Sequence, residues 1–318
     1  MSPGTITNSA NATVITGASG FIGGALVHRL HGLGRPVSAI SRRAGQWPAG
    51  VRRITVSGYE DAAALDEPCA GAGTVVHLAA VAHRGATAAE FGASVAAAEA
   101  VARAAARAHA SRFVLVSSIG VNGNRTEGVP INEESPKRPE EAYAISKLQA
   151  EEAVTAALRG SRTDLVIVRP PLVYGPHAPG NFRRLVRLVC RGLPLPFASI
   201  HNARTFIGLS NLLDLLVLCV EHPAAAGELF VAGDAQDLST PDLARRIGEG
   251  VGCPARLVPM PPGALTLGAS VLGQRRLADS LCASLQVDTS KARRLLGWHP
   301  AVAAADGVRQ AARSFVAS

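Results

Sequence analysis

The chain has 318 residues, 47% of them hydrophobic, and this composition is typical of a globular protein with one large core or one core and a smaller lobe. Its formal net charge is +8, carried almost entirely by arginine, yet these arginines form isolated pairs and aromatic residues make up only 4% of the chain. Nucleic-acid-binding surfaces combine a basic patch with stacking aromatic side chains, so the composition argues against a nucleic acid partner.

Metal binding and membrane insertion are not expected either. The cysteines are scattered without a CxxC motif or a histidine at ligand spacing, and we expect them to be reduced core residues of a cytoplasmic protein. They are Cys69, Cys190, Cys219, Cys253 and Cys282. The polar N-terminus, residues 1–12, does not predict a signal peptide. The most apolar segment, residues 212–220, is too short to span a bilayer and contains Asp214.

A glycine-rich turn follows the first predicted strand. The β-branched run at residues 13–16 ends in Gly17, Gly20 and Gly23, and apolar residues then recur at helical spacing. Glycines at these positions let the turn fold tightly, let the backbone approach a pyrophosphate and let the helix pack closely on the strand. Because a strand precedes the turn and a helix follows it, the pattern favours dinucleotide binding over a simple connecting turn.

The end of the second predicted strand, residues 36–40, indicates the choice of cofactor. Ser41, Arg42 and Arg43 follow it, where NAD-binding folds of this kind carry an acidic residue for the ribose 2′-hydroxyl. A hydroxyl and two guanidinium groups suit a 2′-phosphate, so NADP(H) is favoured and NAD(H) remains possible. The alternative is that both arginines lie on the surface or stack on adenine.

Strands and helices alternate along the following part of the chain. Further strands are expected at residues 53–56, 74–80, 112–118 and 164–169. This alternation predicts an α/β fold with a Rossmann-type, doubly wound parallel sheet. His77 and His83 flank the end of the fourth strand. A packed core role is favoured for His77, whereas His83 is a candidate for substrate contact.

Three residues form a candidate catalytic set. Ser118 ends the fifth predicted strand, and Tyr143 and Lys147 stand four residues apart in a predicted helix, which places phenol and ammonium on one face. We expect the ammonium, with the positive charge of a nicotinamide, to lower the pKa of the tyrosine, while Ser118 hydrogen-bonds the same substrate oxygen. Taken singly, these residues fit an exposed side-chain pair and a strand-end cap. Together with the glycine turn they favour catalysis.

These motifs resemble the extended short-chain dehydrogenases/reductases, in their branch of nucleotide-sugar epimerases, dehydratases and reductases. The TGxxGxxG fingerprint fits residues 16–23, and the catalytic serine and the YxxxK motif fit Ser118, Tyr143 and Lys147. The resemblance covers nearly the whole chain. It implies a homodimer formed through the helices at residues 86–109 and 141–159.

The resemblance also implies two domains with different ligands. The NAD(P)-binding Rossmann domain is expected at residues 1–172, to which residues 203–222 return. A smaller C-terminal α/β lobe, expected at residues 173–202 and 223–318, binds the nucleotide-sugar. The proline-rich stretch that begins at Pro170 cannot continue a sheet, and it marks the crossing into this lobe.

Binding residues follow from the same resemblance. The cofactor is expected at Gly17, Ser19, Gly20, Phe21, Ile22, Gly23, Ser41, Arg42, Arg43, Leu78, Ala79, Ala80, Tyr143, Lys147 and Pro170. A UDP-sugar substrate is expected at His83, Ser118, Asn181, Phe182, Arg204 and Arg276. Arg204 resembles the arginine that holds the UDP diphosphate, which a bidentate guanidinium suits well. Arg276 is either a second such arginine or a surface residue.

Departures from the family bear on the reaction. Gly58-Tyr59 stands where many relatives have an acidic residue that holds the adenine, and Ser94-Val95 where many have Asn-Val. Both changes argue against a permanently held NAD. Stretches such as residues 118–123 and 284–288 resemble a polysaccharide-gene branch whose members are 4-epimerases or reductases of UDP-linked 4-keto sugars.

The expected reaction is therefore hydride transfer at C4 of a UDP-(N-acetyl)hexose. A UDP-4-keto-sugar reductase of surface-polysaccharide precursor synthesis is slightly favoured. The alternative is a 4-epimerase, in which the keto sugar rotates and takes the hydride back on its other face, so that the cofactor must stay bound. A non-catalytic NADP-binding sensor and a dehydrogenase of steroids or phenolics are less favoured.

Overall fold

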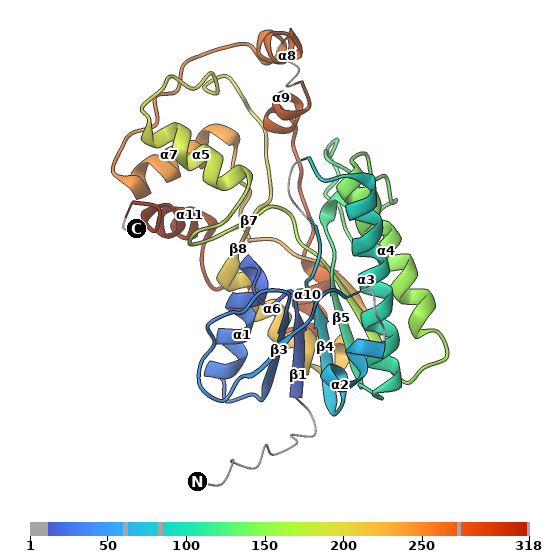
Figure 1. Cartoon of the computed structure of the whole chain (residues 1–318). Coiled ribbons are helices and arrows are strands. Elements are labelled where there is room, and N and C mark those ends of the chain that lie inside the picture. The colour runs from blue at the N-terminus through green and yellow to red at the C-terminus, as the bar shows by residue number, and fades with distance from the viewer. Residues whose placement is uncertain (1–11, 60–62, 82–84, 272–274, 317–318) are drawn as a thin grey trace. The chain divides into compact units, whose positions relative to one another are not determined.

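The computed structural model describes residues 12–59, 63–81, 85–271 and 275–316 (Figure 1). The strands are β1 (Ala12–Thr16), β2 (Val37–Ser41), β3 (Arg52–Thr55), β4 (Ala72–His77), β5 (Arg112–Val116), β6 (Asp164–Arg169), β7 (Val173–Tyr174), β8 (Ile207–Gly208) and β9 (Leu229–Val231). The α-helices are α1 (Phe21–Gly32), α2 (Asp66–Cys69), α3 (Ala88–Arg107), α4 (Ala142–Leu158), α5 (Asn181–Cys190), α6 (Leu209–Glu221), α7 (Thr240–Val251), α8 (Pro262–Val271), α9 (Arg275–Cys282), α10 (Ser290–Leu296) and α11 (Ala304–Arg313).

Seven strands form one sheet in the order β3-β2-β1-β4-β5-β6-β9. The pairs from β3 through β6 are parallel, which confirms the predicted doubly wound α/β fold. The chain moves outward in one direction from β1 to β3 and in the other from β4 to β6. With right-handed crossovers this reversal puts α1 and α3 on opposite faces, and ligands of such sheets bind at the strand ends beside the reversal.

The chain divides into two compact units. The first contains residues 1–117, 141–168 and 216–229. The second contains residues 118–140, 169–215 and 230–318, so its border differs from the one expected at residue 172. The assignment of the cofactor to one unit and of the sugar to the other stays a prediction.

Alanines let two long helices of the first unit pack closely. Helix α3 begins with a capping box, in which Thr87 and Glu90 satisfy each other's backbone amides. Its buried face is almost entirely alanine, and α4 lies beside it (Figure 1). Phe113 and Leu115 of β5 and Val154 of α4 fill the core with these alanines. The alanine-rich pattern is therefore a core-facing surface of the Rossmann unit.

Arg112 connects β5 to a segment more than a hundred residues later. Its Nη1 donates hydrogen bonds to the carbonyls of Cys219, Val220 and His222, each at 3.0 Å, at the C-terminal end of α6. These carbonyls have no partner within the helix, and a guanidinium also complements the negative end of the helix dipole. The contact holds residues 216–229 in the first unit.

The second unit is organised around a buried carboxyl group. Asp234 accepts hydrogen bonds from the Tyr174 hydroxyl (2.6 Å), from Asn211 Nδ2 (2.7 Å) and from the amide of Gly208. Tyr174 and Gly208 belong to β7 and β8, which pair in parallel. Burial raises the pKa of Asp234, and the three hydrogen bonds oppose that rise. This network ties β7, β8 and α6 together.

All five cysteines are free thiols. Cys69 and Cys219 are buried as expected, but Cys190 is exposed, so the prediction of a core position is wrong for it. Cys190 ends α5, where the amphipathic pattern turns its side chain outward. Among the described residues no helix is long and apolar enough to cross a membrane, and no group of three His, Cys, Asp or Glu side chains could hold a metal ion.

Candidate active site

The glycine turn between β1 and α1 fits a dinucleotide. Gly17 has a φ of +68°, and a Cβ there would lie 2.6 Å from the amide nitrogen of Ala79. A Cβ on Gly23 would collide with the carbonyl oxygen of Gly17. Gly20 is the N-cap of α1 and no side chain caps this end of the helix, so the first amides are available to an anion. Ser19, beside them, is exposed.

Tyr59 holds this turn, although the sequence suggested only a missing acid at its position. Its hydroxyl accepts a hydrogen bond from the amide of Gly17 (3.0 Å) and donates one to the carbonyl of Ile40 (3.1 Å). Burial raises the pKa of the phenol, which keeps it protonated and able to do both. The signal in the sequence is a tyrosine four residues after the third strand.

The end of β2 presents two arginines to solvent. Arg42 and Arg43 are exposed, and within the described ranges no side chain or carbonyl accepts from either guanidinium. The Ser41 hydroxyl is buried and donates to the carbonyl of Arg43 at 2.6 Å, which shapes the loop. The positive charge of Arg42 acts on Tyr59, where it opposes the rise in the phenol pKa. Both guanidinium groups therefore remain available to a ligand.

His77 is a structural residue, as expected. It is 2% exposed, and its Nδ1 lies 2.9 Å from the Thr16 hydroxyl across the β1–β4 pair. Burial, with the charge of Lys147 in addition, lowers its pKa to about 3, so the ring stays neutral near pH 7. His83 lies outside the described residues.

The other predicted cofactor residues have mixed environments. Phe21, Ile22, Leu78 and Ala79 are half-buried, Ala80 is exposed and Pro170 is buried. Leu78 donates its amide to the carbonyl of Thr16 at 3.3 Å, which brings the end of β4 beside the glycine turn. Pro170 belongs to the second unit, where its carbonyl accepts from the amide of Ile119.

Tyr143 and Lys147 lie on one face of α4, as their spacing predicts. Lys147 Nζ is 5.9 Å from the centre of the Tyr143 ring and donates a hydrogen bond to the carbonyl of Val116 at 2.9 Å. The lysine is 8% exposed, and burial lowers its pKa to about 8. Burial raises the pKa of Tyr143 to about 12. The expected lowering of the tyrosine pKa is therefore wrong for the protein alone, because desolvation of the phenolate dominates.

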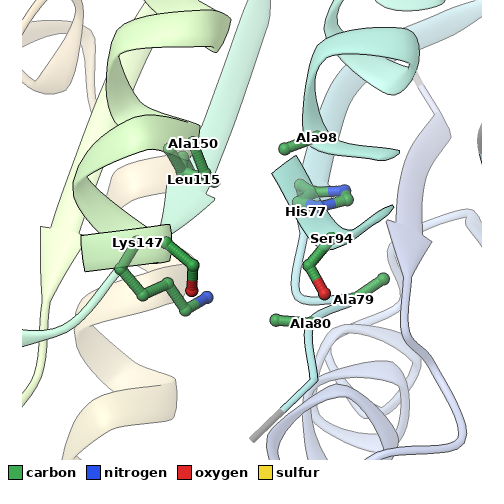
Figure 2. A pocket seen from close by; sticks show the side chains of 9 residues that line it. His77, Ala79, Ala80, Ser94, Ala98, Leu115, Lys147 and Ala150 are labelled. Carbon is green, nitrogen blue, oxygen red and sulfur yellow. The ribbon is translucent and has the colours of Figure 1, made fainter. Parts of the chain in front are cut away.

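A small cavity of about 10 Å³ adjoins Lys147, enough for no more than a water molecule (Figure 2). His77 of β4 and Ser94 of α3 line one side, and Lys147 lines the other. Ser94 Oγ accepts the amide of Val81 at 3.0 Å and donates to the carbonyl of Glu90. Ser94, which stands where many proteins of the resembled family have asparagine, thus anchors the segment after β4.

Ser118 begins the second unit, two residues after Val116, the end of β5, whose carbonyl accepts from Lys147. It is half-buried, and its hydroxyl oxygen accepts the amide of Gly120 at 3.2 Å as the N-cap of a 3-10 turn. The capping role considered for this serine is thus present. It leaves the hydroxyl proton available for a hydrogen bond to another acceptor.

The predicted substrate residues of the second unit divide into exposed and packed side chains. Asn181 is exposed at the start of α5. Phe182 is 2% exposed and packs its ring on Tyr174 and Phe315, with centroids 6.0 Å apart in both pairs. Its contacts are those of a core residue. Arg276 belongs to α9, but its side chain lies outside the described part of the chain.

Arg204 makes structural contacts that the sequence did not reveal. Its Nη1 donates to the carbonyls of Ser280 (2.7 Å) and Ala283 (2.9 Å) at the C-terminal end of α9. Burial lowers the pKa of the guanidinium to about 10. Within the described part of the chain no group accepts from its Nε or Nη2. Arg204 therefore caps a helix and keeps further donors for an anion.

Known proteins resemble this chain in sequence and in fold. The sequence model of the NAD dependent epimerase/dehydratase family matches residues 13–233. Over 207 residues the chain is 39% identical to a UDP-glucose 4-epimerase of Vibrio cholerae. The aligned region covers 64% of this chain and 63% of that protein. The match thus spans less than two thirds of the Vibrio protein.

Two further resemblances extend over most of the chain. It is 25% identical over 296 residues to the N-acetyl-alpha-D-glucosaminyl-diphospho-ditrans,octacis-undecaprenol 4-epimerase of Escherichia coli O157:H7, with 87% of each protein covered. The structure of MoeE5 in complex with UDP-glucuronic acid and NAD superimposes with a TM-score of 0.78 at 23% identity, covering 96% of this chain and 99% of that one. The latter resemblance confirms the fold.

Proposed function

Because this chain belongs to the NAD dependent epimerase/dehydratase family, we propose that it moves a hydride at C4 of a UDP-linked hexose or N-acetylhexosamine. Its favoured reaction is the reduction of a UDP-4-keto sugar for a surface-polysaccharide precursor. The observation that carries this proposal is the pairing of Tyr143 with Lys147, whose ammonium donates to the carbonyl of Val116, the last residue of β5 and two residues before Ser118.

The residues supply the proton that a carbonyl reduction needs. When bound, a nicotinamide dinucleotide supplies the hydride. Tyr143, whose pKa of about 12 keeps it protonated at neutral pH, gives its phenolic proton to the substrate oxygen. Lys147 stabilises the phenolate that results, and Ser118 donates a hydrogen bond to the same oxygen. A protonated tyrosine is the starting state for reduction, and the reverse reaction begins from the phenolate.

NADP(H) is the favoured cofactor. Among the described residues no group accepts from the guanidinium groups of Arg42 and Arg43, which suit the two negative charges of a 2′-phosphate, and residues 41–46 after β2 contain no acidic side chain to repel it. The glycine turn has no room for a Cβ, as close approach of the pyrophosphate requires. A cofactor that exchanges in every cycle suits net reduction.

The substrate is proposed to be a UDP-sugar held by the second unit. MoeE5 binds UDP-glucuronic acid in its complex. In this chain Arg204 Nε and Nη2 are the donors available for the diphosphate, and Asn181 at the start of α5, with Arg276, completes the proposed site. His83 and Phe182 remain weaker candidates. We further propose a cytoplasmic homodimer.

A 4-epimerase is the second candidate, because the Vibrio cholerae relative carries that name at 39% identity. One experiment separates the two. The purified protein is incubated with a panel of UDP-sugars and UDP-4-keto sugars, with and without NADPH. The reductase consumes NADPH in proportion to the keto sugar reduced. An epimerase interconverts C4 epimers without added nicotinamide and retains NAD through purification, and that result would replace the reductase.

A further inference from the structure

Glu151 is a buried acid that the reaction described above does not use. It lies one helical turn beyond Lys147 on α4 and is 2% exposed. The Ser117 hydroxyl, at the end of β5 and 3% exposed, donates to Glu151 Oε1 at 2.5 Å. A charge-assisted hydrogen bond of this length is among the stronger ones, and it fixes the carboxylate relative to the strand.

Val116, the last residue of β5, and Ser117, which follows it, therefore hold two residues of one helix. Val116 accepts from Lys147 through its carbonyl, and Ser117 donates to Glu151 through its hydroxyl. Both contacts lie in the first unit. Ser118 is the next residue of the chain. The anchor of Glu151 and the acceptor of Lys147 are thus neighbouring residues of the chain.

The charges around Lys147 give Glu151 a second effect. His77 faces the lysine from β4, with a pKa of about 3, and Tyr143 lies on the same helix, with a pKa of about 12, so both are neutral at pH 7. Ser94 of α3 is uncharged. Burial lowers the pKa of the lysine, and Glu151 is the charge that opposes it. Without the charge of Glu151, a lysine buried this deeply would lose its proton more readily.

We propose that Glu151 is a positioning residue, whose carboxylate, anchored by Ser117, keeps the ammonium of Lys147 charged and seated on the end of β5. The inference rests on the proposed function for its catalytic meaning, since a neutral lysine cannot stabilise the phenolate of Tyr143. The effect of Glu151 on the charge of Lys147 does not depend on that function.

The composition of the chain allows a direct test. Lysine occurs only at Lys137, Lys147 and Lys291, so selective 13C labelling of the lysine ε-carbons gives three NMR signals. Lys137→Arg and Lys291→Arg identify the remaining signal as Lys147. In Glu151→Gln we expect the titration midpoint of Lys147 to fall by about 0.5–2 pH units, for unit charges roughly 6 Å apart at an effective dielectric between about 80 and 20.

The matched control is Glu152→Gln, because Glu152 is the next residue of the same helix and is exposed. It should leave the midpoint of Lys147 unchanged, and Glu151→Asp should restore most of the shift. An unchanged midpoint in a folded Glu151→Gln protein overturns the proposal. Should that variant fail to fold, Ser117→Ala decides. In Ser117→Ala, a fall in the Lys147 midpoint that is smaller than the one expected for Glu151→Gln supports the anchoring by Ser117. An unchanged midpoint overturns the proposal.

Turnover gives a second readout. In the NADPH-dependent direction the basic limb of the kcat/KM profile should move to lower pH in Glu151→Gln by the shift that NMR records, and it should stay in place in Glu152→Gln. If no UDP-4-keto sugar is reduced by the unaltered protein, the proposed function fails while the NMR titration still tests Glu151. If turnover is present and the limb does not move although the NMR midpoint does, the link to catalysis is overturned.

Discussion

The Tyr59 hydroxyl joins the amide of Gly17 to the carbonyl of Ile40, and so ties the glycine turn after β1 to the end of β2. We expect Tyr59→Phe to lower the free energy of unfolding by about 1–3 kcal/mol, because the amide of Gly17 loses its partner and the carbonyl of Ile40 keeps only the amide of Ala18. It should also weaken NADPH binding several-fold, since the turn loses its support. Urea denaturation and calorimetry measure the two effects, and unchanged NADPH affinity would limit Tyr59 to a packing role.

The chain has only two other tyrosines, and each supplies a contrast. Tyr174→Phe removes the hydrogen bond to Asp234 in the second unit. A buried carboxyl group then loses one of its three donors, so unfolding free energy should fall by about 1–3 kcal/mol. Affinity for NADPH should not change. A loss of NADPH binding as large as that of Tyr59→Phe would show that the two tyrosines do not act separately.

Tyr143→Phe should lower turnover strongly and leave cofactor affinity nearly intact, because it removes only the transferable proton. General acid–base catalysis contributes roughly 10²–10⁴-fold, and the loss of kcat should lie in that range. Steady-state kinetics with NADPH and fluorescence titration of NADPH binding give the two numbers. Activity within a few-fold of the unaltered protein would remove Tyr143 from the catalytic role.

The double change Arg42→Ala with Arg43→Ala should erase a preference for NADPH over NADH. Loss of a charge-assisted contact of about 1.5–3 kcal/mol corresponds to roughly tenfold to a hundredfold in NADPH affinity. NADH affinity should hardly change. Arg103→Ala, an exposed arginine on α3, is the control. Equal affinities of the unaltered protein for both cofactors would refute the 2′-phosphate site.

Arg204→Ala should weaken UDP binding by about 1.5–3 kcal/mol without changing NADPH binding. Because Arg204 also caps α9, part of the loss comes from stability, which thermal unfolding reports separately. Arg204→Lys keeps a charge but not the planar fork, so it should recover little of the UDP affinity. Lower stability with unchanged UDP affinity would leave Arg204 as a helix cap alone.

His77 predicts a pH dependence of stability. Its pKa is about 3 in the folded protein and about 6.5 in the unfolded chain, so the unfolded state binds one more proton between these values. Stability from this group is complete above pH 6.5 and declines as pH falls, by about 1.4 kcal/mol per pH unit. Urea unfolding of His77→Gln should show a shallower slope between pH 6.5 and 4. An identical slope would contradict the assignment.

The sequence predicted the parallel sheet, the glycine turn and the Tyr143–Lys147 face, because strand periodicity, glycine spacing and helical spacing are local. It did not predict the contacts of Tyr59, Glu151 or Arg204, since each joins segments that only the fold brings together. The pKa of Tyr143 differs from the expected direction for a related reason. The neighbouring ammonium is visible in the sequence, but the depth of burial that outweighs it is not.

The first unit consists of three separate segments of the chain, and the last of them, residues 216–229, is synthesised long after the other two. During synthesis the carbonyls that receive Arg112 leave the ribosome about a hundred residues after the arginine itself. A nascent chain that has reached residue 172 therefore lacks the end of α6 and the strand β9. Expressed alone, such a fragment would carry an open sheet edge at β6 and an uncovered apolar surface, both of which promote aggregation.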